Sequence, residues 1–318
     1  MPPPMLRPRS KSSPPEELPS RADAESAAPG GAPKSQEAAA WRTFFDSKDM
    51  VSGFCVYSRL CAGSRATIVA LHGLGLCALS FGPLANRRLP ANFVAIDLRG
   101  HGETVHDGVC SIDVFVDDTL AVLKEMQVEL KDVILLGHSF GALVAVKVAE
   151  KMPHILGIVI MDMVEEMARM QITEEMHSKL HLETLQSFSS VEDAIKHAVK
   201  ERRVSSELGQ VTVPEMLKRD AASSWAWRVD VASTFEFWES WFSGFGDSVL
   251  KMKMAKCVIL SNLMVLDRLW TLAQMQGKLQ VEFCPGGGHF FHETHPEDVA
   301  QILLRFLERY TRGTACMD

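Results

Sequence analysis

The stretch DVILLGHSFGALVAVKVAEKM, residues 132–152, decides the fold. It opens with a short apolar run, which is typical of a strand buried on both faces of a sheet. It continues from Phe140 with residues that favour a helix. The junction between the two carries GHSFG (137–141), a GxSxG motif. This context predicts a nucleophile elbow, a tight turn that exposes the Ser139 hydroxyl above the sheet.

Further short apolar runs flank this stretch, and helical patterns separate most of them. The expected strands cover residues 66–73, 92–100, 157–162, 257–263 and 279–285, and the clearest helical patterns cover 112–129 and 298–311. Continuous apolar strands that alternate with helices predict an α/β fold, with a mostly parallel central sheet and helices on both faces. Ligands of such sheets bind at the carboxyl ends of the strands.

The composition excludes several classes of protein. The chain has 318 residues, 47% of them hydrophobic, and a net charge of −7, which argues against a nucleic-acid binder that must neutralise phosphates. No apolar run approaches the ~20 residues of a membrane helix, and the N-terminus has no signal-peptide core. Seven scattered cysteines without a CxxC pair favour a reducing compartment. We therefore expect a protein of the cytoplasm, the nucleus or both, without a membrane anchor.

Two segments differ in composition from the rest. Residues 1–40 hold nine of the fifteen prolines and no aromatic residue, so we expect a disordered tail there. The first aromatic cluster begins at Trp41, and residues 41–318 are expected to form one α/β domain. Residues 163–250, between two expected strands, carry helical patterns and are predicted to form a helical cap.

A serine nucleophile needs a base and an acid that orients it. His289 follows the expected strand 279–285 and a glycine-rich turn and precedes the last helix, which is where the chain order of α/β hydrolases places the base. Two residues compete for the acid. Asp162 ends the strand 157–162, whereas Asp267 follows the strand 257–263. Chain order alone does not decide between them.

Two more motifs bear on the site. HGLG (72–75) follows an early strand and resembles the turn that supplies one oxyanion amide, here that of Leu74; the second should come from Phe140. DLRGHG (97–102) is interpreted as a turn tied by an Asp–Arg pair. The spacing of three between His289, His292 and His295 could suggest a metal, but a glycine turn and a proline interrupt it. We expect neither a metal nor a cofactor.

Five segments together resemble the protein phosphatase methylesterase family. They are GHSFG, AIDLRGHGET (95–104), IVIMDMVEE (158–166), the tryptophan-rich WAWRVDVASTFEFWESWFSGF (225–245) and MQGKLQ (275–280). The resemblance covers about residues 41–311. It implies an α/β hydrolase with a cap, a serine carboxylesterase that removes the methyl ester from the C-terminal leucine of the type 2A protein phosphatase catalytic subunit.

The resemblance also implies a triad of Ser139, Asp162 and His289, with Asp267 as the fallback acid. The chain departs from the family pattern in three places. This chain has HGLG where the family has the turn HGGG, and it has Glu166 where the family has a glycine. It also lacks a long acidic insertion of the cap around 200–224. Two alternatives stay open, a general small-ester or acyl hydrolase with the same triad and a catalytically silent protein that masks the phosphatase tail.

Removal of residues 1–40 is expected to leave folding and most of the esterase activity intact, because this segment has no core-forming residues. Circular dichroism and the rate of ester hydrolysis, compared with the full chain, would test this. Loss of the fold or of most of the rate would show that the tail is structural.

Overall fold

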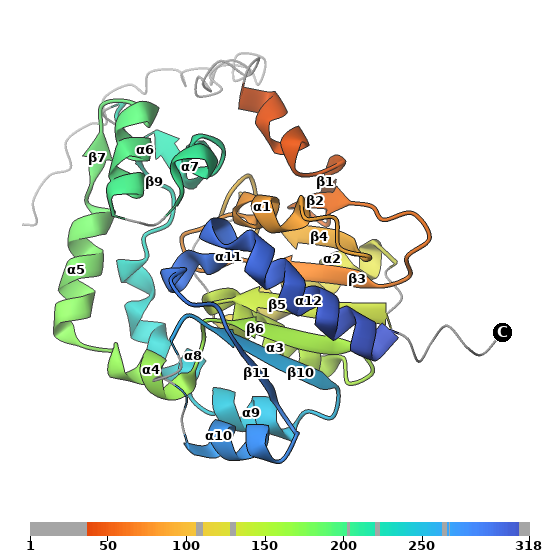
Figure 1. Cartoon of the computed structure of the whole chain (residues 1–318). Helices are drawn as coiled ribbons and strands as arrows, with labels where there is room; N and C mark the ends of the chain where they lie inside the picture. The colour runs from red at the N-terminus through yellow and green to blue at the C-terminus, as the bar shows by residue number, and fades with distance from the viewer. Residues whose placement is uncertain are drawn as a thin grey trace, which may run out of the picture.

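The computed structural model describes residues 37–105, 111–127, 132–201, 204–219, 223–262, 266 and 268–311. A large sheet crosses the molecule in the order β1-β2-β4-β3-β5-β6-β10-β11 (Figure 1). Its strands are β1 (Ser47–Val51), β2 (Phe54–Arg59), β3 (Thr67–Leu71), β4 (Asn92–Ile96), β5 (Val133–His138), β6 (Gly157–Met161), β10 (Ala255–Leu260) and β11 (Gln280–Phe283). The pairs β1–β2 and β2–β4 are antiparallel and the other pairs are parallel. The predicted mostly parallel α/β sheet is confirmed.

The hairpin of β1 and β2 is the part of this sheet that the sequence pattern did not predict. The strand β1 lies at the edge and is not buried at any position, so its SKDMV sequence shows no apolar run. By contrast, β2 is buried along most of its length. Edge strands are short and polar in many proteins because an apolar edge would pair with other chains. This explains why the sequence of β1 has no apolar pattern from which a strand could be predicted.

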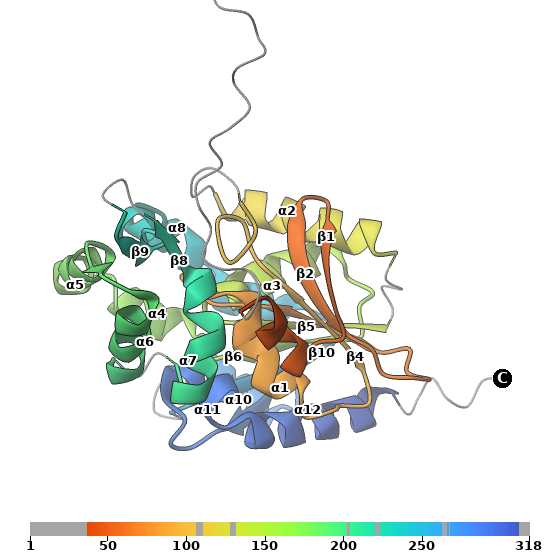
Figure 2. The same cartoon turned by 90° about the horizontal axis from the view of Figure 1, so that it is seen from above.

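Helices cover both faces of the sheet. One face carries α2 (Ile112–Glu125), α3 (Phe140–Lys151), α9 (Phe245–Lys251) and α10 (Arg268–Met275), and the other carries η2 (Ala78–Phe81), α1 (Gly82–Ala85), α11 (Phe291–Thr294) and α12 (Pro296–Thr311). Figure 2 shows α2 and α12 on opposite sides of the strands. Alternate strand residues enter the two cores: Val69 and Leu71 join the core that contains α3, whereas Ile68 and Ala70 join the core that contains η2 and α12.

A long insertion connects the neighbouring strands β6 and β10. It contains α4 (Glu165–Met170), α5 (Glu174–Thr184), α6 (Val191–Lys200), α7 (Ser206–Thr212), η4 (Pro214–Met216), η5 (Ala232–Phe237) and α8 (Trp238–Phe242). It also contains a small antiparallel sheet of β7 (Ser187–Phe188), β9 (Trp225–Trp227) and β8 (Leu217–Arg219), in that order. The expectation of a helical cap over residues 163–250 did not include these three strands, each of which is only two or three residues long.

The insertion divides into two parts. The elements α5, α6, α7 and the small sheet stand beside one end of the large sheet (Figures 1 and 2). Their own apolar cluster includes Phe188, Ala198 and Leu217. The last part of the insertion instead joins the main core, where Trp241 and Phe245 are buried.

The turn from β5 into α3 brings two backbones into close contact. A Cβ atom on Gly141 would lie 2.1 Å from the carbonyl oxygen of Leu71 in β3. Only glycine allows this approach, and it lets α3 begin directly above the sheet. In the described part of the chain, no helix is both long and apolar enough to span a bilayer.

Candidate active site

The predicted site residues all follow strands of the large sheet at its carboxyl edge. Leu74 follows β3, Ser139 follows β5, Asp162 follows β6, and His289 lies beyond β11 on η7 (Gly288–Phe290). Because neighbouring parallel strands end at the same edge, residues far apart in sequence meet there.

Ser139 occupies a strained turn. Its φ of +51° and ψ of −121° lie outside the regions that a residue with a side chain normally adopts. The turn is held because the Ser139 amide donates a hydrogen bond to the carbonyl of Met161 (3.0 Å). Ser139 is also the N-cap of α3, so the next amide, that of Phe140, belongs to the first turn of the helix, where amides have no intrahelical acceptor. That amide is available to a developing negative charge.

Asp162 and His289 form a direct hydrogen bond. His289 Nδ1 lies 2.7 Å from Asp162 Oδ2. The other carboxylate oxygen, Oδ1, accepts hydrogen bonds from the amide (2.9 Å) and the hydroxyl (2.8 Å) of Ser261. Since a carboxylate only accepts, Nδ1 carries the proton and leaves Nε2 of His289 free to act as a base.

These hydrogen bonds keep Asp162 ionised. Burial by itself would raise the pKa of this carboxyl, but the hydrogen bonds from His289 and Ser261 outweigh burial and hold its pKa below the ordinary value. Ser261 therefore contributes to the site although the sequence pattern did not single it out. Its only signal was its position at the end of the expected strand 257–263.

Ser139 and His289 line the same cavity. Among the described residues no hydrogen bond joins the Ser139 hydroxyl to His289. In sites without substrate such bonds are often long and tighten only when the substrate is bound. The competing acid, Asp267, lies outside the described residues.

Two buried histidines hold the HGLG turn. The His72 ring bonds the Gly73 carbonyl through Nδ1 (2.8 Å) and accepts the Leu98 amide at Nε2 (3.0 Å). The His101 ring bonds the Arg99 carbonyl through Nδ1 (2.8 Å) and accepts the amide of Gly75 at Nε2 (3.0 Å). Both rings are thus neutral, with the proton on Nδ1.

Burial enforces that neutral state. It lowers the pKa of His72 well below its usual range and that of His101 to about 4. The turn that carries the Leu74 amide therefore keeps its hydrogen bonds at neutral pH.

The interpretation of DLRGHG as a turn tied by an Asp–Arg pair is wrong. Asp97 accepts the amides of Ala78 (2.7 Å) and Glu103 (3.0 Å), and burial, opposed by these bonds, raises its pKa to about 6. Arg99 instead makes a bidentate ion pair with Asp118 on α2, at 2.7 Å for both bonds. The two residues are only two positions apart in the sequence, but Asp97 binds the start of η2 and Arg99 binds α2.

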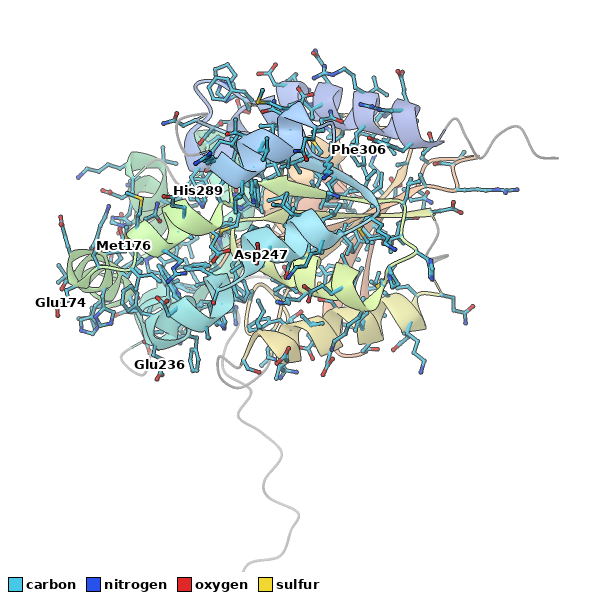
Figure 3. All side chains as sticks on the ribbon, turned by 90° about the horizontal axis from the view of Figure 1, so that it is seen from below. Glu174, Met176, Glu236, Asp247, His289 and Phe306 are labelled. Carbon is cyan, nitrogen blue, oxygen red and sulfur yellow. The ribbon has the colours of Figure 1, made fainter. Side chains whose placement is uncertain are left out.

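A cavity of about 470 Å³ opens above Ser139. The core supplies the HGLG turn, His138, Ser139 and His289, and the insertion supplies the opposite wall. Figure 3 labels His289 and, on α5, Met176, which line this cavity from the two sides. The wall from the insertion consists of Met176, Lys179, Leu180, Glu183, Thr184, Ala198, Glu201, Val204, Met216, Trp227, Val229 and Val231.

The tryptophans of the insertion lie in different places. Trp227 lines the cavity, whereas Trp225 packs under the guanidinium of Arg219, 4.4 Å from the ring centre. Trp241 is buried against Phe140 (ring centres 4.7 Å apart). Trp238 donates from its indole nitrogen to a threonine one helical turn earlier.

Two further predicted features lie away from the reacting atoms. Glu166 is exposed and lines a separate hollow with Arg169. His289, His292 and His295 also diverge: His292 is fully buried against Phe81, and the His295 ring bonds its neighbour Thr294.

Comparison with known proteins shows the family to which this chain belongs. Residues 68–302 match the alpha/beta hydrolase family. The protein phosphatase methylesterase 1 of Schizosaccharomyces pombe is 32% identical over 290 residues, which cover 85% of this chain and 84% of that protein. The chain belongs to the protein phosphatase methylesterase family. The protein of the same name from Emericella nidulans is also 32% identical, over 81% of this chain and 71% of that one.

Solved structures agree on the fold. The crystal structure of E-2-(acetamidomethylene)succinate hydrolase aligns with a TM-score of 0.66 at 17% identity and covers 82% of this chain and 98% of its own. An esterase from Mycobacterium tuberculosis aligns with a TM-score of 0.63 at 20% identity and covers 82% and 90%. As a member of the methylesterase family with this fold, the chain is a carboxylic ester hydrolase.

Asp162→Asn is expected to lower turnover by about 10³- to 10⁴-fold, because an amide can hold His289 in the wrong tautomer and cannot stabilise its cation. Steady-state hydrolysis of a nitrophenyl ester would measure this. Asp267→Asn is the matched control and should have a milder effect. A larger loss in the control than in Asp162→Asn would make Asp267 the acid.

Proposed function

We propose that Ser139, His289 and Asp162 form the triad of a serine esterase that demethylates the C-terminal leucine methyl ester of the type 2A protein phosphatase catalytic subunit. The observation that carries the proposal is the 2.7 Å bond between His289 and Asp162 at the cavity that Ser139 lines, in a chain of the methylesterase family. The relatives' name supplies the substrate class, a methylated protein phosphatase.

The reaction has two steps. In the first, Ser139 Oγ attacks the carbonyl carbon of the methyl ester while His289 Nε2 takes the hydroxyl proton. The tetrahedral intermediate collapses, the C–O bond to the methoxy group breaks, and His289 returns the proton to release methanol. In the second, His289 removes a proton from water and the water oxygen attacks the carbonyl carbon of the leucyl acyl-enzyme. The bond from that carbon to Ser139 Oγ then breaks, His289 returns the proton to Oγ, and the free leucine carboxylate leaves. No cofactor takes part in either step.

Two backbone amides stabilise the intermediate in this proposal, those of Leu74 and Phe140. Fixed donors that point at a developing oxyanion commonly supply a large part of the rate, about 2.7–4 kcal/mol for one donor. The Phe140 amide lies at the N-terminus of α3, a helix of twelve residues, whose partial positive charge would also stabilise the oxyanion. The Leu74 amide depends on the two neutral histidines that hold its turn.

The insertion serves as the cap over this site. In this proposal residues 41–318 act as one hydrolase domain with residues 163–250 as its cap. The predicted disordered tail, residues 1–40, lies outside the described residues except at its end, where η1 (Glu37–Thr43) is helical, so order begins a few residues before the expected boundary at Trp41. The cavity lies between the core and the cap, and its wall is largely apolar with a few charged groups, among them Lys179 and Glu183. Such a wall suits an extended peptide end that carries an uncharged ester.

The alternative is a general small-ester hydrolase with the same triad. A small ester needs only the serine, the base and the oxyanion amides, whereas a protein tail must also be held by the cap. The two functions therefore differ in how strongly the cap affects the rate.

Demethylation of a methylated phosphatase catalytic subunit by the full chain is the test. We expect Ser139→Ala to abolish both demethylation and covalent labelling by a fluorophosphonate probe, because both need the serine hydroxyl. The free carboxyl terminus can be followed by mass spectrometry. Labelling without demethylation would support the small-ester alternative, and neither activity in the parent chain would contradict the triad.

Trp227→Ala is expected to slow phosphatase demethylation at least tenfold, a loss of about 1.4 kcal/mol of transition-state binding. Hydrolysis of a short nitrophenyl ester should fall much less, because Trp227 belongs to the cap wall of the cavity. Trp225→Ala is the matched control, since it lies on the same strand, β9, and does not line the cavity. An equal loss of both activities in Trp227→Ala would contradict a role in reading the protein.

A further inference from the structure

The proposed base occupies a position that its local sequence does not hold firmly. His289 follows three consecutive glycines, of which Gly286 (φ +82°) and Gly288 (φ +58°) adopt left-handed backbone conformations. Glycines leave the backbone many alternative states. The His289 side chain is also 42% exposed, so packing alone does not fix its ring. Its placement must come from bonds to other elements.

Two hydrogen bonds supply this placement. One joins the His289 ring to Asp162, as described above. The other joins the His289 main chain to His138: the His138 ring nitrogen Nε2 lies 2.8 Å from the carbonyl oxygen of His289. A carbonyl oxygen only accepts, so His138 donates from Nε2–H. The side chain and the main chain of His289 are thus bound separately, from the ends of β6 and β5.

His138 is itself held rigidly. Its side chain is fully buried. On the Nδ1 side lies Gly73 of the HGLG turn, so close that a Cβ atom there would be 2.9 Å from Nδ1. The ring of His292 lies against it, with ring centres 4.3 Å apart. The donor therefore points at the His289 carbonyl with little freedom to turn away.

The chemical state of the ring suits this task. Burial lowers the pKa of His138 well below its usual range, so the ring is neutral and carries one proton. That proton is on Nε2, where the acceptor is, and Nδ1 has no hydrogen-bond partner among the described residues. A charged ring here would repel the cation that His289 becomes during the reaction.

We propose that His138, the second residue of the GxSxG motif, is a positioning residue that clamps the main chain of His289 beneath the catalytic cavity. The inference rests on the proposed role of His289 as the base. One short segment then has two tasks: Ser139 provides the nucleophile, and the residue before it fixes the backbone of the base. His138 also contacts the turn that precedes the oxyanion amide of Leu74.

The competing explanation is that His138 only fills space in the core. The two explanations differ in one respect, since clamping needs a donor at the position of Nε2 and packing needs only volume. Glutamine can place an amide N–H close to that position, whereas methionine has a similar length and no donor. Their comparison separates the hydrogen bond from the packing.

The experiment measures kcat and KM for nitrophenyl acetate in the full chain with His138→Gln and His138→Met, per amount of folded protein. We expect His138→Met to lower kcat at least tenfold with KM within about twofold, because the misplaced base affects the chemical step. His138→Gln should recover most of this loss. His292→Phe is the matched control: it alters the same ring stack without touching the His289 carbonyl, and should lower thermal stability but leave kcat within about twofold.

Equal losses in His138→Gln and His138→Met, or no loss in either, would overturn the proposal, as would a loss of kcat in His292→Phe as large as in His138→Met. Ser139→Ala, measured alongside, distinguishes this failure from that of the triad, because it must abolish turnover whatever His138 does. If His138→Met does not fold, nitrogen-15 spectra of histidine-labelled parent protein decide. The resonance that is lost in His138→Gln must show protonation at Nε2, and protonation at Nδ1 alone would overturn the clamp.

Discussion

The candidate active site depends on backbone hydrogen bonds between neighbouring parallel strands. These bonds continue for one residue beyond the ends of β5 and β6, to Ser139 and Asp162. Ser139 and Asp162 both have positive φ angles, +51° and +49°, and strain of this kind costs about 1–3 kcal/mol per residue. Each of these residues is held by a hydrogen bond from its backbone amide to the neighbouring strand: the Ser139 amide donates to the carbonyl of Met161 (3.0 Å), and the Asp162 amide donates to the carbonyl of Ile259 (2.9 Å). The sheet thus holds the two strained residues in place, and its hydrogen bonds fix the spacing between the proposed nucleophile and the proposed acid.

Electrostatically, the site is surrounded by neutral rings. Four buried histidines lie around it, and burial lowers the pKa of each of them: His72, His101, His138 and His292. Among these five described histidines, His289 alone is partly exposed to solvent and hydrogen-bonded to a carboxylate. Because the buried rings stay uncharged, the positive charge that the proposed mechanism forms on His289 would face the carboxylate of Asp162 without a second cation from these rings.

Much of this arrangement could be predicted from the sequence. Buried parallel strands leave continuous apolar runs, and the GHSFG motif at a strand end placed Ser139 correctly at the start of α3. The edge strand β1 and the three short strands of the insertion left no such signal. The partner of Arg99 could not be predicted, since Asp118 comes from a helix that only the fold brings near. The same holds for His138, whose acceptor lies 151 residues away in the chain.

The connection between β6 and β10 has a consequence for how such a protein can change over evolution. The two strands are direct neighbours, with Ile160 paired to Val258, so the intervening segment contributes no strand to the large sheet. Surface insertions of this kind can grow or shrink at small entropic cost. The cavity wall that the insertion supplies can therefore diverge while the proposed catalytic residues at the strand ends stay in register. If the proposed roles hold, selectivity and chemistry are encoded in separable parts of one chain.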